Sequence, residues 1–254
     1  MYHVNCMNKK LLIKILVCCV SMPCGMLVPG FHAHAQVIME VMPNARPMDA
    51  SVVFYGAANF NNAIPYGKIP GSPFLKDEWQ LAALYSENDK EKWLVKTKLN
   101  LTTGEIYFIS KTGEEMVAPE NMVRKIVFYK DNDTAQTEAV YRNDYGEGLI
   151  NSKDKNNYVQ VMNEGNYQLL KLPRRPVVEA DSFHIAKRYF FRDEIRYFIQ
   201  YNNKTAPLKK LSADNILVYL PGANSFHAWA DQHSINFKKE EDVVRFLDYY
   251  NAKK

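Results

Sequence analysis

Cysteine is absent from most of this 254-residue chain, because all four cysteines lie within the first 35 residues. Without a thiol beyond residue 35, the rest of the chain offers no disulfide framework, no zinc-thiolate site and no cysteine nucleophile. Excess charge is also missing there. Setting aside the three lysines of residues 1–35 leaves 29 Lys and Arg against 28 Asp and Glu, a net charge of +1. That balance argues against a protein that binds nucleic acid through general electrostatic attraction.

Signatures of several enzyme classes are missing as well. The chain contains no Gly-rich phosphate loop, no dinucleotide-binding glycine pattern, no H-E-x-x-H zinc motif and no G-x-S-x-G elbow. Asp131 and Asp133 begin like a calcium loop, but Ala135 and Gln136 stand where the next oxygen ligand and the glycine are required. The sequence therefore predicts no bound cofactor.

Residues 1–35 have the composition of a secretory signal peptide. They contain no Asp, Glu or Arg, and their three lysines precede an apolar stretch that ends in Ala33-His34-Ala35. We expect cleavage before Gln36, with Met7 as a plausible true start. The alternatives are a lipoprotein or an uncleaved membrane anchor, and an anchor needs about 20 predominantly apolar residues. Proline and glycine interrupt the stretch at positions 23, 25, 29 and 30, which favours a cleaved signal. No later segment is apolar enough to span a membrane, so we expect no membrane span in the mature chain.

The remaining chain changes texture twice. Residues 36–73 hold five of the twelve prolines and one short apolar run, Val52–Tyr55, so we predict an extended, Pro-rich lead-in with one strand. From Trp79 to Leu211, short alternating apolar runs are separated by Gly, Asn and Asp clusters, as is typical of antiparallel strands. The clearest hairpin joins residues 158–162 to 167–172, because Gly and Asn in the turn tolerate the positive φ that tight turns demand.

After Leu211 the hydrophobic period changes from two to about 3.6, which indicates helices. Ser212 and Ser225 are candidate N-caps of two short helices, and Glu240-Glu241-Asp242 would begin a third. The apolar stripe of that third helix consists of Val243, Phe246, Leu247 and Tyr250. Helices this short must pack on the sheet. The predicted fold is therefore α+β and mainly β: an antiparallel hairpin-built sheet of about eight to ten strands, barrel- or sandwich-like, with two or three short C-terminal helices. Residues 74–254 would form one domain, helical from about residue 212.

Four segments carry a resemblance. They are Gly71-Ser72-Pro73-Phe74-Leu75 to Trp79, the hairpin Leu99–Phe108, the turn Gly113-Glu114-Glu115-Met116, and the ending from Lys209-Lys210-Leu211 to Asp248-Tyr249-Tyr250-Asn251. Over roughly Gly71 to Asn251, the chain resembles uncharacterised secreted proteins of Bacteroidetes-type bacteria. The resemblance implies a Gram-negative source and a periplasmic, cell-surface or extracellular location. Those proteins have no established activity, so no residue role is transferred.

A weak metal site is suggested near the C-terminus. His227 and Asp231 are four residues apart, so a helix would place them on one face, within reach of one ion. His233 could join them only if the helix ends before it. The simpler interpretation is an exposed helix face with a local hydrogen bond, and we predict no metal.

The segment Arg188–Tyr201 interleaves aromatic residues with arginines and is the most distinctive stretch. As one strand, its odd positions would form an apolar face and Arg188, Arg192 and Arg196 a basic outer face; the segment could also fold at Asp193-Glu194. Arg174 and Arg175, between two prolines, would form a second exposed basic spot. We take these five arginines and Tyr197 as candidate ligand-binding residues, and none as catalytic.

These observations predict an exported, non-enzymatic protein of the cell envelope or the extracellular space. Its expected partner is an envelope protein or a polysaccharide, bound through an exposed aromatic or basic surface. The alternative is an exported hydrolase, metal-assisted or not, with a site around His227 and Asp231. An enzyme would need a pocket where a base, a nucleophile or a metal converge, and this requirement separates the two hypotheses.

Overall fold

A computed structural model describes residues 37–38, 42, 44–47, 53–55, 63–65, 68–145, 157–180 and 188–253. The chain divides into residues 1–35 and a compact unit of residues 36–254, and the description below concerns that unit. The predicted signal peptide lies outside the described residues. Among the described helices, none is long and apolar enough to cross a membrane.

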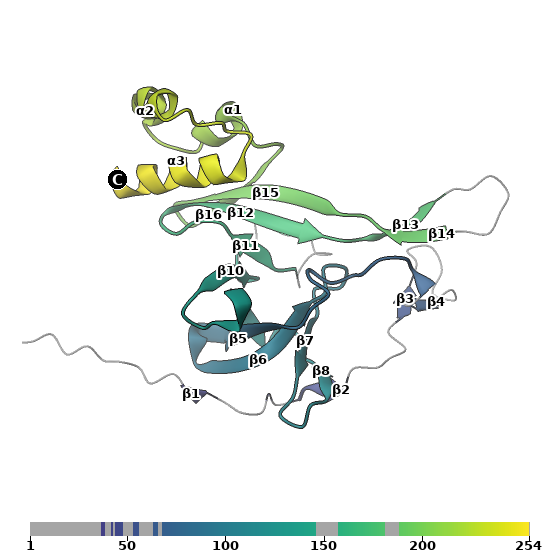
Figure 1. The fold of residues 1–254 in the computed structure, drawn as a ribbon. Helices are drawn as coiled ribbons and strands as arrows, with labels where there is room; N and C mark the ends of the chain where they lie inside the picture. The colour runs from purple at the N-terminus through teal and green to yellow at the C-terminus, as the bar shows by residue number, and fades with distance from the viewer. Residues whose placement is uncertain are drawn as a thin grey trace, which may run out of the picture. The chain divides into compact units, whose positions relative to one another are not determined.

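Twelve strands of the described chain form one sheet, shown in Figure 1. Its order is β16-β15-β12-β11-β10-β9-β5-β6-β7-β8-β2, and β1 adds to β6. The pairings are antiparallel except for β1 with β6. The strands are β1 (Val37–Ile38), β2 (Arg46–Pro47), β5 (Gln80–Ser86), β6 (Glu91–Leu99), β7 (Ile106–Ile109), β8 (Glu115–Val117), β9 (Val123–Tyr129), β10 (Thr137–Arg142), β11 (Val159–Val161), β12 (Tyr167–Arg174), β15 (Glu194–Tyr201) and β16 (Lys204–Leu208). The predicted mainly-β, hairpin-built fold is confirmed, and the described strands do not close into a barrel.

Two smaller hairpins stand apart from this sheet: β3 (Val53–Tyr55) with β4 (Ala63–Pro65), and β13 (Val177–Ala180) with β14 (Arg188–Phe191). The described residues of the Pro-rich region 36–73 thus contain four short strands rather than the single one expected. Two of these, β1 and β2, join the main sheet. This region therefore extends the sheet at β6 and β8.

Turn chemistry explains why the hairpins form where they do. Between β15 and β16, Asn202 and Asn203 have φ values of 45° and 60°, the left-handed pair that a two-residue hairpin turn requires. The turn between β11 and β12 uses Gly165 at φ 110°. A Cβ added at Gly165 would lie 2.6 Å from the Asn251 side chain, so glycine is needed here for space as well as for conformation.

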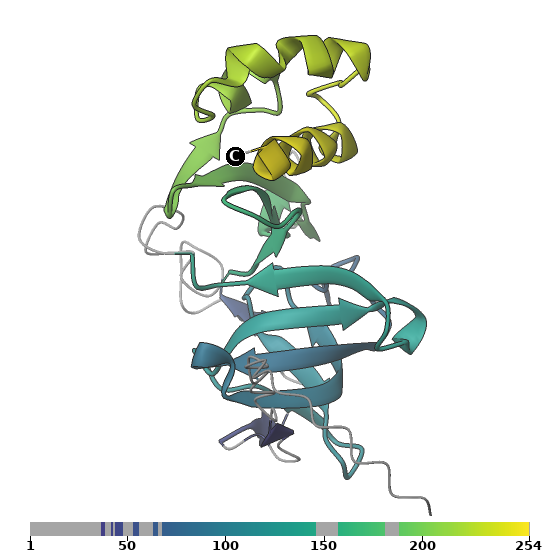
Figure 2. The same ribbon diagram turned by 90° about the vertical axis from the view of Figure 1, so that its left-hand side faces the viewer.

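The hydrophobic core lies on several faces of the sheet. Strands β5 to β10 curl around one cluster that includes Leu84, Trp93 and Ile126 (Figure 2). Further along, Leu169 of β12 and Ile199 of β15 face the C-terminal helices. An adjacent residue on each strand, Leu170 on β12 and Phe198 on β15, faces the other way and is buried in a separate cluster. Strands β12 and β15 are therefore covered on both faces.

The described part of the chain has three α-helices: α1 (Ala213–Leu217), α2 (His227–Gln232) and α3 (Glu240–Lys253). Ser212 caps α1 as predicted, because its side chain accepts a hydrogen bond from the Asn215 backbone N–H. The predicted stripe of α3 is fully buried against the sheet. The predicted cap of α2 is wrong: Ser225 lies in a short 3-10 turn before the helix and donates its hydroxyl to the Gly222 carbonyl.

Candidate functional sites

A concavity of about 410 Å³ opens where β15 passes the end of β16, and we name it the basic depression. Two candidate residues from the sequence, Arg196 and Tyr197, lie in its wall. The other lining residues are Ile195, Leu208, Lys209, Lys210, Leu211 and Lys238. They come from β15, from the segment that joins β16 to α1, and from the loop before α3. The depression thus gathers cations from three parts of the chain.

Among the described residues, no acidic side chain lines the basic depression. Lys209, Lys210 and Lys238 are exposed, and none of them forms an ion pair with the described residues. Glu240, which contacts the lining residue Tyr197, is held by Lys171 at 2.9 Å and accepts a hydrogen bond from the Tyr197 hydroxyl. Uncompensated cations around a concavity attract anionic groups from solution.

Tyr197 and Ile195 give the basic depression an apolar component. The Ile195 side chain is 50% exposed, although an odd-numbered position was expected to be buried. Ile195 is exposed because the beginning of β15 extends beyond the helices. Further along the strand, both faces are covered. The Tyr197 ring is half-buried, and burial together with the bond to Glu240 raises the pKa of its hydroxyl. Its hydroxyl is therefore a fixed, protonated donor already committed to Glu240.

The three alternate arginines of the 188–201 segment do not share one strand face. The segment breaks at Arg192-Asp193, so Arg188 belongs to β14 and Arg196 to β15. Arg192 sits in the bend, where it is exposed and pairs with Glu194 at 2.6 Å. The alternative prediction of a fold near Asp193 describes the backbone better than the single strand does. Of the three arginines, Arg196 is the one that lines the basic depression.

Arg175 is a structural residue rather than the exposed basic spot predicted. Its side chain is 23% exposed, and its Nη1 donates to the Ser72 and Phe74 carbonyls at 3.0 and 2.6 Å. Its Nε donates to Asp193 at 2.6 Å. Its neighbour Arg174 is also half-buried. The segment between two prolines is thus packed against the rest of the domain, and the prediction of a free basic surface at these two residues is wrong.

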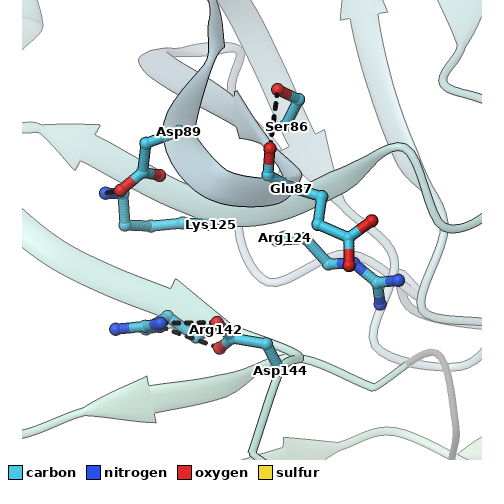
Figure 3. Close-up of a pocket in the computed structure, with 7 residues that line it drawn as sticks. All are labelled: Ser86, Glu87, Asp89, Arg124, Lys125, Arg142 and Asp144. Carbon is cyan, nitrogen blue, oxygen red and sulfur yellow. Dashed lines mark hydrogen bonds and ion pairs between the residues drawn. The ribbon is translucent and has the colours of Figure 1, made fainter.

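A second concavity, of about 450 Å³, lies at the other part of the sheet, and we name it the charged depression (Figure 3). It is formed by the end of β5, the 3-10 turn Glu87–Asp89, β9 and the end of β10. Its lining consists of Ser86, Glu87, Asp89, Arg124, Lys125, Arg142 and Asp144. Three cations and three anions therefore surround one space.

A β-bulge directs two consecutive cations into the charged depression. Strand alternation would place Arg124 and Lys125 on opposite faces of β9. However, Tyr85 pairs with Lys125 and Ser86 with Val123, which leaves Arg124 as an extra residue on β9. A bulge of this kind re-aims a side chain, and both residues line the depression. Sequence alternation alone could not reveal this arrangement.

Most of the charges in the charged depression are paired. Lys125 contacts Asp89 at 2.9 Å and lies 4.1 Å from the centre of the Tyr85 ring. Arg142 binds Asp144 through two nitrogens, at 2.8 and 2.5 Å, and this bond raises the pKa of the guanidinium. Arg124 and Glu87 remain, and neither forms an ion pair with any described residue.

The weak metal candidates do not converge. His227 and Asp231 are exposed on α2, and no group of three His, Cys, Asp or Glu among the described residues could hold a metal ion. The His233 ring stacks on Trp229 at 4.2 Å, and its Nδ1 lies 2.8 Å from the Trp229 carbonyl. Trp229 stacks in turn on Tyr249 at 3.9 Å. His233 therefore extends an aromatic stack that joins α2 to α3.

Comparison with known proteins assigns neither site, because no family model, no curated protein and no solved structure matches the chain. The two depressions are therefore judged on their own geometry and charge.

Proposed function

We propose that this chain is an exported, non-enzymatic binding protein of the cell envelope or extracellular space, and that its basic depression binds an acidic segment of a partner protein. The observation that carries the proposal is that Lys209, Lys210 and Lys238 are exposed, form no ion pair with a described residue, and line a depression whose described lining contains no acidic side chain. A carboxylate-rich segment would find its charges complemented there.

The apolar lining favours a protein segment over a polysaccharide. Ile195 is exposed, and Leu208 and Leu211 are buried residues of the same lining. A polypeptide can offer an apolar side chain to these residues and carboxylates to the lysines. A sugar ring would need an exposed aromatic face on which to stack. Tyr197 is the sole aromatic side chain among the lining residues, and it is half-buried with its hydroxyl bound to Glu240.

The free edge of the sheet has features that prevent unselective strand pairing at the same place. Within the described sheet β16 is the terminal strand, and it carries Pro207. In the register with β15, Pro207 occupies a position whose backbone nitrogen points away from β15, where a further strand would need an N–H donor. The partner is therefore expected to be recognised by side chains in the basic depression rather than by extension of the sheet.

Export is proposed from the N-terminal sequence, which combines three lysines, an apolar stretch and Ala33-His34-Ala35. N-terminal sequencing of the protein recovered from the exported fraction of expressing cells is expected to begin at Gln36. Recovery of a chain that keeps residues 7–35 would contradict the cleavage and favour an anchor.

Binding is tested with a terminally blocked peptide in which four glutamates surround one leucine, measured by fluorescence anisotropy. Replacing Lys209, Lys210 and Lys238 by Gln is expected to weaken binding by at least about tenfold. The matched control replaces Lys68, Lys90 and Lys130, three exposed lysines outside the depression, and removes the same net charge. Equal weakening by both triple variants would show general charge attraction and contradict the proposed site.

Two further ligands decide between classes of partner. Polygalacturonate carries carboxylates without apolar side chains, and a peptide with alanine in place of leucine separates charge from apolar contact. We expect the leucine peptide to bind more tightly than either. Tighter binding of polygalacturonate would identify an acidic polysaccharide as the partner instead.

A further inference from the structure

The charged depression holds two opposite charges that the protein does not neutralise. Arg124 and Glu87 line the same concavity, yet they form no ion pair with each other or with another described residue. Figure 3 shows both side chains on one side of the view, with the Asp89–Lys125 and Arg142–Asp144 pairs on the other. Both charges are therefore available to a ligand that enters the depression.

The rest of the lining holds these two groups in place. The bulge in β9 fixes Arg124 beside Lys125, and Lys125 is restrained by Asp89 and by the Tyr85 ring. Arg124 is half-buried, and its positive charge acts on the buried Tyr158, where it opposes the rise in pKa that burial causes. Glu87 begins the 3-10 turn that follows β5. A half-buried guanidinium on a strand is better preorganised for a ligand than a freely mobile surface arginine.

The charge pattern selects the chemistry of the ligand. An anion would be attracted by Arg124 and repelled by Glu87, and a cation would meet the reverse. A molecule with one carboxylate and one ammonium group can satisfy both residues at once. The two internal ion pairs are already neutral and add hydrogen-bonding surface without favouring either sign.

We propose that the charged depression binds the zwitterion of an amino acid or a short peptide, with the carboxylate on Arg124 and the ammonium on Glu87. The site is separate from the basic depression, since the two share no lining residue. Its volume of about 450 Å³ accommodates a ligand of that size.

To test this, the protein as purified from the expressing cells is titrated with glycine, glycylglycine and triglycine. Binding is monitored by amide chemical shifts in NMR spectra. At least one of the three is expected to saturate below about 10 mM and to shift amides of residues 86–89, 124–125 and 142–144. N-acetylglycine and glycinamide, which each keep one charge, are expected to bind at least about tenfold more weakly than that ligand. The length of the best ligand distinguishes a free amino acid from a peptide.

Two charge-removing variants, Arg124→Gln and Glu87→Gln, are each expected to weaken the best ligand by at least about tenfold, and Arg188→Gln, outside the depression, to leave it unchanged. Thermal unfolding confirms that the variants are folded. The proposal is overturned if no zwitterion saturates by about 20 mM, if N-acetylglycine binds as well as the zwitterions, or if Glu87→Gln binds like the unchanged protein. The comparison of ligands needs no variant, so a destabilised Arg124→Gln protein would still leave the question decided.

Discussion

Replacing Arg175 tests whether this arginine stabilises the fold or contacts a ligand. Its guanidinium donates two hydrogen bonds to the backbone carbonyls of Ser72 and Phe74. Hydrogen bonds from a charged group contribute about 1.5–3 kcal/mol each. The side chain is 23% exposed, so water replaces part of what is lost, and we take about 3 kcal/mol in total. The pair with Asp193, which is 73% exposed, adds at most about 1 kcal/mol.

For a domain of this size, each kcal/mol shifts the midpoint of thermal unfolding by about 2–4 °C. Arg175→Ala is therefore expected to lower Tm by about 6–12 °C, measured by circular dichroism. Arg175→Lys keeps the charge but has a single nitrogen in place of the Nη1 and Nε that bind the carbonyls and Asp193, so its Tm should fall between those of Arg175→Ala and the unchanged protein. Arg188→Ala is the control, because Arg188 is exposed and its side chain forms no hydrogen bond or ion pair with the described residues.

The reasoning would be refuted if Arg175→Ala melted within about 1 °C of the unchanged protein, or if Arg188→Ala lost as much stability. Binding gives a second criterion. The folded Arg175→Lys variant should bind the acidic leucine peptide as the unchanged protein does, because Arg175 does not line the basic depression. A binding defect without a loss of stability would restore Arg175 as a ligand contact.

Two further predictions concern α3 and the buried tyrosines. Asn251 makes three hydrogen bonds of 2.9–3.0 Å to the backbone of Glu164 and Tyr167. Asn251→Ala should therefore lower the free energy of unfolding, measured in urea, by about 2–3 kcal/mol. Asp248 is exposed on the same helix, so Asp248→Ala should leave the free energy of unfolding nearly unchanged. Burial raises the pKa of Tyr145 and Tyr250 to about 12, against about 10 in an unfolded chain. Their contribution to stability is thus fully present below pH of about 10 and lost as the pH rises through about 12; tyrosinate absorbance that reached completion near pH 10 in the folded protein would contradict this.

Elements with a complete local signal were predicted correctly. The turn after residue 162 combines a glycine and asparagines with alternating residues on both sides, and β11 and β12 pair there. For α3, the acidic residues of the first turn and the single apolar stripe both indicate a helix, and the four stripe residues are buried. In both cases the information lies within about 15 residues of sequence, and these local signals agree with the tertiary packing.

Predictions that assumed one exposed face and one buried face failed. Ile199 faces the helices and Phe198 faces the opposite cluster. Because both faces of β15 are covered, alternation of residue types no longer distinguishes a buried face from an exposed one. Arg175 was expected to be exposed because two prolines flank it. Its burial depends on the Ser72–Phe74 segment, about a hundred residues earlier, which a local pattern cannot detect.

The candidate sites were only partly visible in the sequence for the same reason. Arg196 and Tyr197 were singled out, but the lysines beside them follow β16 or precede α3, and sequence offers no cue that these loops meet. Arg124 was not predicted as a site residue, because no pattern in residues 123–129 indicates that the pairing of β9 with β5 leaves Arg124 unpaired. A bulge is decided by the register of two strands, which lie here some 40 residues apart.

The two depressions differ in how charge is used, and this difference makes the two proposals independent. The basic depression has no acidic lining, so its affinity should fall steeply with salt, as expected of exposed charges within a Debye length of about 10 Å at 0.1 M. The charged depression is balanced, with two of its three possible pairs closed internally. A zwitterion adds no net charge, so its binding should change little with ionic strength. A steep loss of affinity for the acidic peptide and an almost constant affinity for the zwitterion as salt is added, measured on one protein sample, would therefore separate the two sites without any substitution.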